Sequence, residues 1–259
     1  MPGGIAVAFV LTVLFCWVVF RLGFLSRSGA IAATALGTIV LGLGGWAWVF
    51  PLLAFFISSS LLSKARSCSQ RVVEEVRGLQ RDAVQVLANG GIAGAVVLIA
   101  TFWRHDLYSV YLGALAAANA DTWSTEIGIM LGRNPRSIVS GKPVPPGTSG
   151  GVTLAGTLAA LIGAALIAWI GRLSQHTALE SGTLLAVTIA GLGGSLCDSV
   201  LGATLQARCR CRVCSKETEK PSHCGQPTDF ARGLCWLDND GVNLLCASVG
   251  ALCAALLTA

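Results

Sequence analysis

The sequence predicts an all-α protein: a polytopic bundle of about seven or eight transmembrane helices with short cytoplasmic loops and a small Cys-rich insert. Hydrophobic residues make up 54% of the 259 residues and charged residues only 12%, whereas a soluble domain carries roughly 25% charge. The mean hydropathy is +0.70. Apolar stretches recur with the length of about 17–25 residues that a bilayer requires. We expect residues 1–259 to form a single integral-membrane domain, with the Cys-rich insert at residues 205–240.

Eight apolar stretches are the candidate spans. They lie at residues 4–20, 29–45, 47–62, 84–102, 108–132, 150–171, 182–204 and 241–258. The pair 29–45 and 47–62 leaves two alternatives open, because only Gly44, Gly45 and Trp46 are available for a turn between them. The pair forms either two spans or a single bent, re-entrant element.

The basic residues predict the orientation of the chain. If the N-terminus is outside, all of the 18 Lys and Arg residues except Arg104 and Arg172 fall on one face. An excess of Lys and Arg marks the cytoplasmic side. The sequence therefore predicts a multi-pass protein of the cytoplasmic membrane whose active face is cytoplasmic. The net charge of +5 is spread over short loops, so it does not indicate nucleic-acid binding.

Ionisable residues within the spans indicate a polar cavity that opens to the cytoplasm. Asp121 and Glu126 lie in the stretch 108–132, and Asp198 lies in 182–204. Such residues are costly in lipid and are usually functional. Because carboxylates suit Mg²⁺, we expect these three to hold that ion. The alternative is a set of buried, hydrogen-bonded side chains that hold helices together. The other polar candidates, at cytoplasmic ends of spans, are Asn89, Gln206, Asn239, Asp240 and Asn243.

Helical spacing refines this expectation. Asp198, Gly202 and Gln206 are four residues apart in turn, which predicts a shared helix face. Asp121 and Glu126 are five residues apart, about 140° around an ideal helix. These two carboxylates would converge only if the helix is broken there or if a ligand lies between them.

A loop rich in Pro and Gly, residues 142–151 (KPVPPGTSGG), leads into the stretch 150–171. We expect Thr148 or Ser149 to cap that helix, and helix N-termini with free N–H groups bind phosphate. It is not a P-loop, because the lysine precedes the glycines. The alternative is an ordinary Gly/Ser-rich helix entry. The phosphate-binding candidates are Lys142, Gly147, Thr148, Ser149, Gly150 and Gly151.

The Cys-rich insert contains a candidate zinc site. Cys211 and Cys214 form a C-x₂-C pair, and His223 and Cys224 follow. Two Cys plus a later Cys and His can bind Zn²⁺ tetrahedrally. Such a zinc would be structural, since a polar loop has no core of its own. The alternative is free cytosolic thiols. The spare candidate ligands are Cys209 and Cys235.

Five strings in the sequence together resemble an integral-membrane family that includes transmembrane protein 19 and plant phytyl-phosphate kinase. The strings are QVLANGG, ANADTWSTEIG, PPGTSGGVTLAG, GSLCDSVLGATLQ and LDNDGVN. The resemblance runs from about residue 30 to residue 250, and the insert CRVCSKETE…HCG looks like that of bacterial and archaeal members. The residues that match are Asn89, Asp121, Glu126, Lys142, Gly147, Gly150, Gly151, Asp198, Gln206, Asp240 and Asn243.

The resemblance to the kinase member implies transfer of a nucleotide γ-phosphate, from CTP in related lipid kinases, to an isoprenoid monophosphate. Phosphoryl transfer needs positioning and charge neutralisation more than covalent participation. By that chemistry the carboxylates would hold Mg²⁺, Lys142 and Gly147–Gly151 would hold nucleotide phosphates, and the neutral candidates with Asp240 would complete the site. The alternative is a transporter for a phosphorylated or anionic solute. A transporter should have polar groups that reach the far side, yet the outer halves of the spans are almost wholly apolar.

Overall fold

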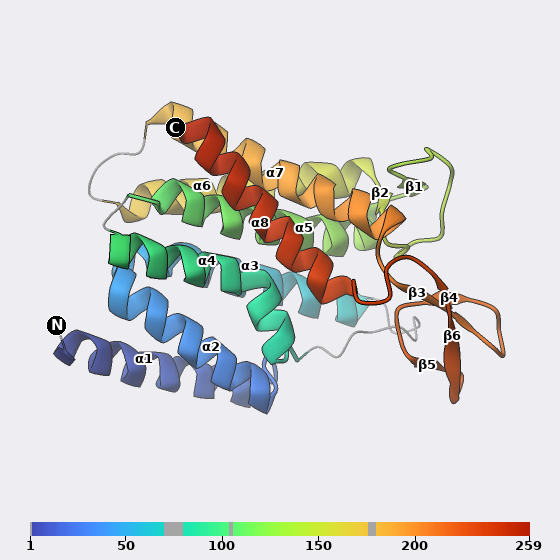
Figure 1. The fold of residues 1–259 in the computed structure, drawn as a ribbon, viewed down its shortest axis with the longest axis horizontal. Coiled ribbons are helices and arrows are strands. Elements are labelled where there is room, and N and C mark those ends of the chain that lie inside the picture. Colours follow the sequence, from blue (N-terminus) through green and yellow to red (C-terminus); the bar gives the residue numbers. More distant parts are fainter. Residues whose placement is uncertain (1, 70–79, 104–105, 176–179) are drawn as a thin grey trace.

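A computed structural model describes residues 2–69, 80–103, 106–175 and 180–259. In this part of the chain, long helices form a bundle with short strands at one end (Figure 1). The α-helices are α1 (Pro2–Arg21), α2 (Arg27–Ile39), α3 (Trp46–Ser69), α4 (Ala83–Trp103), α5 (Tyr108–Leu131), α6 (Leu154–Ser174), α7 (Ser181–Thr204) and α8 (Asn239–Thr258). Seven candidate spans are long and apolar enough to cross a membrane: six of these helices, and α2 together with the turn that follows it, Arg27–Gly44. Among the described helices, α5 is the one that is not a candidate span. The predicted fold class, a polytopic helical membrane protein, is confirmed.

The stretches 29–45 and 47–62, which the sequence predicts as either two spans or one re-entrant element, form two antiparallel elements. α2 continues into one π-helical turn, η1 (Val40–Gly44), and Gly45 then reverses the chain into α3. Gly45 has a φ of 79°, a conformation that glycine adopts without steric cost. Both elements are long and apolar enough to span, which favours two spans over a re-entrant element.

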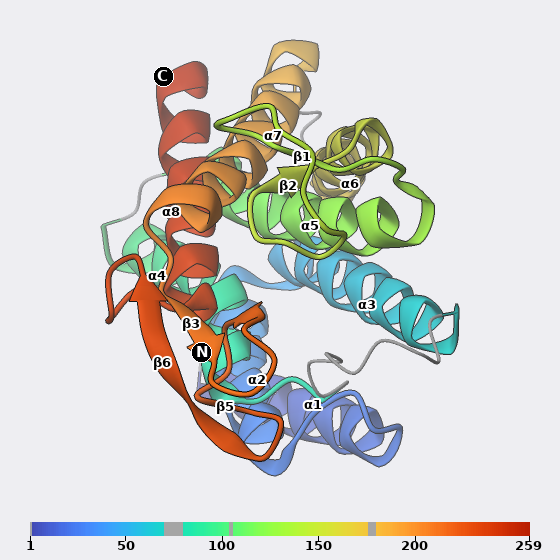
Figure 2. The ribbon, with the colours of Figure 1, turned by 90° about the vertical axis from the view of Figure 1, so that its right-hand side faces the viewer.

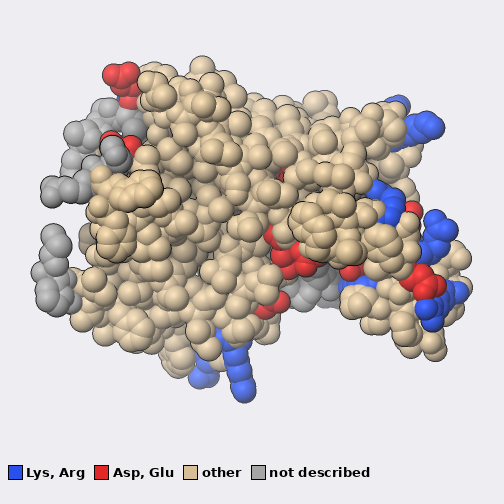
Figure 3. Space-filling view, in the orientation of Figure 1, with Lys and Arg blue, Asp and Glu red and all other residues tan. Residues whose placement is uncertain are grey.

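Both chain ends lie at one end of the bundle, and the strands lie at the other (Figure 1). We call the second end the insert end, because the Cys-rich insert lies there. The strands are β1 (Arg136–Ser137), β2 (Gly151–Val152), β3 (Arg208–Cys211), β4 (Glu217–Thr218), β5 (Ser222–His223) and β6 (Gln226–Arg232). β1 pairs with β2, and the insert forms an antiparallel sheet in the order β4-β3-β6-β5. On the face drawn in Figure 3, blue Lys and Arg surface gathers around the insert end and below the bundle, whereas the flank of the bundle is mostly uncharged.

α5 is the central helix, although its composition is the least suited to lipid. Every residue from 111 to 120 is buried, and α3, α4, α6, α7 and α8 all pack against it. Figure 2 shows α5 beside α3, α6 and α7, with α1 at the far edge of the bundle. A helix that carries polar side chains at membrane depth must face protein rather than lipid. The neighbouring helices therefore shield the polar residues that excluded α5 from the apolar spans.

Small residues let α5, α7 and α8 approach closely. A Cβ added to Gly194 of α7 would lie 2.5 Å from Ala117 Cβ of α5 and 2.8 Å from the carbonyl oxygen of Cys246 in α8. A Cβ added to Gly250 of α8 would lie 2.4 Å from the carbonyl oxygen of Gly113 in α5. Close backbone approach at small residues is a common way in which membrane helices associate. The three helices therefore form a tightly packed half of the bundle.

This packing predicts opposite effects for two adjacent glycines. Gly194→Ala should lower the unfolding temperature by several degrees, because overpacking costs about 1–3 kcal/mol. Gly193→Ala is the matched control, since a Cβ there would meet nothing within 4 Å and alanine favours helix. Thermal unfolding of the purified protein in detergent measures both. Equal unfolding temperatures for the two variants would contradict the packing described here.

Candidate functional site

Helix direction brings most of the predicted polar residues to the insert end. α4 and α8 begin at that end, and α5 and α7 finish there (Figure 1). Asn89 lies in the first third of α4, Asp121 and Glu126 in the second half of α5, and Asp198 in the last third of α7. Asn239, Asp240 and Asn243 occupy the first turns of α8, after the N-cap Asp238. The half of the bundle next to the insert end therefore contains polar groups from four helices.

Asp121 and Asp198 face a common neighbour. The thiol of Cys246 in α8 lies within electrostatic range of both carboxyl groups, and Cys246 Sγ lies 3.6 Å from the carbonyl oxygen of Ala117 in α5. Both aspartates are half-buried. The structure thus places these two carboxylates in the region where α5, α7 and α8 meet.

Glu126 points toward α3, away from the region where α5, α7 and α8 meet. It is buried, and its carboxylate accepts a hydrogen bond from Ser63 Oγ at 2.7 Å and forms an ion pair with Arg66 Nε at 2.8 Å. Both partners belong to α3. α5 runs unbroken through Asp121 and Glu126, so the two side chains keep their helical separation. Among the described residues, Asp121, Glu126 and Asp198 do not form a group of three that could hold one metal ion.

Arg81 adds a second positive charge near Glu126. Burial lowers the pKa of Arg81 to about 10, and the Glu126 charge partly opposes that shift. The guanidinium therefore remains positive at neutral pH. Its terminal nitrogen donates to Ser59 Oγ of α3 at 3.0 Å.

The phosphate-binding candidates Gly147–Gly151 form a compact turn against α7, which we call the phosphate-loop turn. A Cβ on Gly150 would lie 2.4 Å from Ala203 Cβ and 2.6 Å from the carbonyl oxygen of Ser199, and Gly150 has a φ of 75°. Thr148 Oγ1 donates to the carbonyl oxygen of Pro145 at 2.7 Å. The turn therefore sits on the last turns of α7, close to Gly202 and Gln206.

The predicted cap of the following helix is wrong. α6 begins at Leu154, and its N-cap is Thr153, whose Oγ1 accepts from the backbone N–H of Gly156 at 3.0 Å. Thr148 and Ser149 cannot cap it, because Gly151 and Val152 first pair with Arg136 and Ser137 as strands. Any phosphate held by this loop would therefore contact the turn and not the N-terminus of α6. The side chain of Lys142 is exposed in the same loop.

Gln206 is buried but lies beyond its helix. α7 ends at Thr204, so the shared helix face predicted for Asp198, Gly202 and Gln206 does not extend to Gln206. Gln206 nevertheless packs on Gly202, where an added Cβ would lie 3.3 Å from Gln206 Oε1 and 3.3 Å from the backbone nitrogen of Gly150. The side chain thus still borders the phosphate-loop turn.

Three buried N–H donors at the insert end have no hydrogen-bond acceptor among the described residues. They are Gln206 Nε2, Arg208 Nε and Asn239 Nδ2. Burying a polar group without a partner costs free energy, so such donors indicate a site for an acceptor. Arg208 also donates from Nη1 to Ser149 Oγ at 3.3 Å and to Glu219 Oε1 at 2.7 Å. A carboxylate of the insert therefore already lies against the phosphate-loop turn.

The Cys-rich insert forms a compact group of metal ligands. The ligand atoms of Cys211, Cys214, His223 and Cys224 all lie within 4.8 Å of one another. His223 Nδ1 lies 3.5 Å from Cys214 Sγ and 3.2 Å from Cys224 Sγ. The backbone N–H of Val213 donates to Cys211 Sγ at 3.3 Å. A similar bond from Cys214 lowers the pKa of the Cys211 thiol to about 6. The cluster could therefore hold a metal ion, and the spare cysteines Cys209 and Cys235 lie outside it.

Sequence reasoning missed three arginines: Arg66, Arg81 and Arg208. Each lies within a few residues of a membrane span and was counted only as a loop charge. Arg81 and Arg208 had a usable signal, because each stands at the end of a span that carries a polar candidate, Asn89 or Asp198. The partner of Arg66 depends on how α3 packs against α5, which spacing does not reveal.

A model of the integral membrane protein family DUF92 matches residues 10–251. The chain belongs to this family. Protein PGR of Arabidopsis thaliana is 37% identical over 247 residues, which are 85% of this chain and 84% of that protein. An uncharacterized membrane protein of Methanocaldococcus jannaschii is 33% identical over 187 residues, 71% of this chain and 76% of that protein.

Protein VTE6, chloroplastic, of Arabidopsis thaliana is 28% identical over 245 residues, which are 90% of this chain and 65% of that protein. No solved structure matches the chain. The matched residues include the strings on which the family resemblance rests, and the predicted family is confirmed. The chain is therefore an integral, multi-pass membrane protein.

The ion pair between α3 and α5 predicts a stability effect. Glu126→Gln should lower the unfolding temperature by several degrees, because Arg66 is left without its charged partner, at a cost of about 3 kcal/mol or less. Arg66→Gln should have a similar effect, and the double variant should cost less than the sum of the two. Thermal unfolding in detergent measures all three. Purely additive losses would show that the pair is not coupled.

Proposed function

We propose that the protein is a membrane-embedded phosphotransferase that transfers the γ-phosphate of a nucleoside triphosphate to an isoprenoid monophosphate. One observation carries this proposal: buried N–H donors and two carboxylates from different helices lie at the same end of the bundle. The donors suit phosphate oxygens, and the carboxylates suit the Mg²⁺ that accompanies a nucleotide. The resemblance to the phytyl-phosphate kinase family supports the acceptor class, and it supports CTP as the donor.

Asp121 and Asp198 are the proposed Mg²⁺ ligands. Mg²⁺ is usually held by one or two carboxylates together with substrate phosphates, so two aspartates suffice. Glu126 could join them only by exchanging Arg66 and Ser63 for the ion. We therefore place Glu126 in the site as the group that fixes Arg66 and lies near Arg81. Bound Mg²⁺ would neutralise the charge that develops on the transferred phosphoryl group.

The donor phosphates would bind at the phosphate-loop turn. The backbone of Gly147–Gly151 with Thr148 and Ser149 forms its floor, and Gln206, Arg208 and Asn239 supply buried donors. The contact of Arg208 with the carboxylate of Glu219 indicates that this place accepts an anionic oxygen, which a phosphate would replace. Lys142 would add charge from the exposed loop, and Asp240 and Asn243 would border the site from α8.

The acceptor requires no strong general base. A phosphate monoester is already an anionic nucleophile at neutral pH, so the chain needs to orient it and screen its charge. The described histidine, His223, belongs to the insert cluster, so the proposal assigns no histidine to the reaction. We further propose that the insert end is the cytoplasmic face of the membrane, where nucleotide is available.

The insert cluster is the proposed site of a structural Zn²⁺. Three cysteine sulfurs and one imidazole nitrogen are a common ligand set for closed, tetrahedral zinc. The ion would stabilise a small sheet whose side chains are mostly exposed. It would thereby hold Glu219 and Arg208 beside the phosphate-loop turn.

The proposed reaction predicts that Asp121→Asn and Asp198→Asn lose transfer. Each should reduce Mg²⁺-dependent transfer to geranylgeranyl or phytyl monophosphate by about a hundredfold or more, since one such electrostatic contact contributes about 3 kcal/mol. Both variants keep the side-chain shape and should still fold. Asp106→Asn, at the opposite end of the bundle, is the control. Transfer from labelled CTP and other nucleotides is the measurement, and full turnover in the two variants would refute the proposal.

The zinc proposal has its own test within the insert. Protein purified without chelators should contain about one Zn²⁺ per chain. Cys211→Ser with Cys214→Ser should remove it, whereas Cys209→Ser with Cys235→Ser should not. Elemental analysis of the intact protein measures the metal content. A wild-type protein without metal would mean that the cluster consists of thiols only.

A further inference from the structure

An apolar cavity lies between α1, α2, α3 and α4. Its volume is about 240 Å³. It is lined along α3 from Trp46 to Phe56, a distance of about 15 Å at the helical rise per residue. Phe15 of α1 and Leu36 of α2 belong to the other walls. The cavity is therefore long and narrow, and its direction follows the helices.

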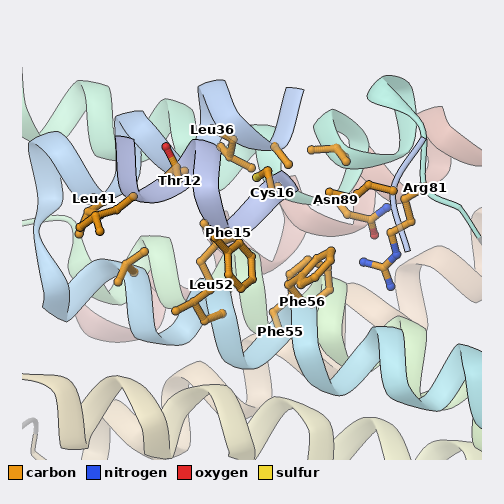
Figure 4. Close-up of a pocket in the computed structure, with 18 of the residues that line it drawn as sticks. Thr12, Phe15, Cys16, Leu36, Leu41, Leu52, Phe55, Phe56, Arg81 and Asn89 are labelled. Carbon is orange, nitrogen blue, oxygen red and sulfur yellow. The ribbon is translucent and has the colours of Figure 1, made fainter. Parts of the chain in front are cut away.

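Polar side chains gather at one end of this cavity. Arg81, Gln85 and Asn89 line it there. Figure 4 shows Arg81 and Asn89 at one end and Leu41 at the opposite end, with aromatic and aliphatic side chains between them. The polar end is the insert end, because α4 begins there. A cationic side chain of the cavity lining therefore lies toward the same end of the bundle as the carboxylates.

Arg81 is held in place by its backbone. Its N–H donates to the carbonyl oxygen of Phe24 at 3.0 Å, and its own carbonyl oxygen accepts from the N–H of Ser26 at 3.0 Å. The guanidinium lies 5.7 Å from the ring centroid of Phe55 and 5.8 Å from that of Phe56. Arginine has five N–H donors in a planar fork that matches phosphate. The charge is thus fixed at the point where the apolar lining ends.

The outer wall of the cavity faces the bilayer. α1 packs against α2 and η1, and its outward side chains, including Val7, Leu14 and Trp17, are exposed. Between α1 and α3, the rings of Phe15 and Phe56 meet edge to face at a centroid distance of 6.1 Å. An occupant would therefore enter sideways from lipid, past these two rings, and not from water.

We propose that this cavity binds the acceptor lipid, a single-chain isoprenoid monophosphate, with its tail between α1 and α4 and its phosphate on Arg81 and Asn89. This rests on the proposed function and assigns its acceptor site. The narrow shape suits one chain and not two. The positive end matches a phosphate, and Arg81 lies within electrostatic range of Glu126, five residues from the proposed Mg²⁺ ligand Asp121.

Direct binding without nucleotide tests this site. The probe is geranylgeranyl monophosphate, measured on the purified protein by native mass spectrometry and by thermal stabilisation. Ala33→Trp fills the cavity from α2 and should weaken binding roughly tenfold or more, since the tail loses its apolar contacts. Ile31→Trp is the matched control, because Ile31 is 74% exposed on the same helix and does not line the cavity.

A second variant tests the head position. Arg81→Gln should weaken binding of geranylgeranyl monophosphate roughly tenfold, since a charge-assisted hydrogen bond is lost, and should leave binding of geranylgeraniol unchanged. Inorganic phosphate should not compete, because it cannot use the apolar walls, and dioleoyl phosphatidic acid should bind more weakly. Equal binding by wild type, Ala33→Trp and Arg81→Gln, in folded protein, would overturn the proposal.

The binding and transfer measurements together distinguish a failure of the acceptor-site proposal from a failure of the phosphotransferase proposal. If wild type binds the lipid in the cavity but transfers no phosphate from any nucleotide, the phosphotransferase proposal fails and the acceptor site stands. If transfer occurs and Ala33→Trp changes neither binding nor its KM for the lipid, the cavity proposal fails and the reaction stands.

Discussion

The need to keep the polar side chains of α5 away from lipid determines the arrangement of the bundle. Asn119, Asp121 and Glu126 lie in one helix at membrane depth, where unpaired polar groups are costly. Asn119 is fully buried, accepts from Ser58 Oγ at 3.0 Å and donates to the carbonyl oxygen of Gly163 at 2.8 Å. The partners of Asn119 and Glu126 come from α3 and α6, and Asp121 lies within electrostatic range of Cys246 in α8. The apolar helices therefore surround α5, and the polar site forms where their inner ends meet.

The two halves of the bundle pack around α5 with side chains of different size. On the side of α7 and α8, glycine and alanine bring backbones into contact, which positions Asp121 and Asp198 with little free volume. On the side of α1 to α4, larger side chains leave a cavity with one charged end. A rigid half suits ligands of fixed geometry, such as a metal–nucleotide complex, whereas a looser half suits a flexible hydrocarbon chain. The proposed division between donor and acceptor follows from this asymmetry of side-chain size.

Hydropathy and charge predicted the helices and the common end of the polar residues, because these depend on local sequence and on helix direction, and five short sequence strings predicted the family. They did not predict which neighbour each polar residue faces. Glu126 pairs with Arg66 because α3 returns along α5, and the sequence left open whether α3 exists as a separate span. Likewise Gln206 leaves its helix, and Thr153 caps α6, because strand pairing and loop packing override local helical signals. The Cys cluster was predictable since its four ligands lie close in sequence, whereas the partner of Arg66 became visible only through the packing of α3 against α5.

The half of α5 farther from the insert end is closely packed and hydrogen-bonded. Tyr108 and Tyr111 are buried there, and Tyr108 donates to the carbonyl oxygens of Ala47 at 2.8 Å and Gly171 at 3.2 Å. Tyr111 donates to the carbonyl oxygen of Trp48, whose ring packs against both tyrosines at centroid distances of 5.1 and 4.8 Å. An alternating-access cycle would have to open this packed, hydrogen-bonded region to pass a solute. A phosphotransferase needs access from one side only, for nucleotide from water and for lipid from the bilayer. The packed region around the two tyrosines therefore supports the proposed phosphotransferase over the transporter alternative.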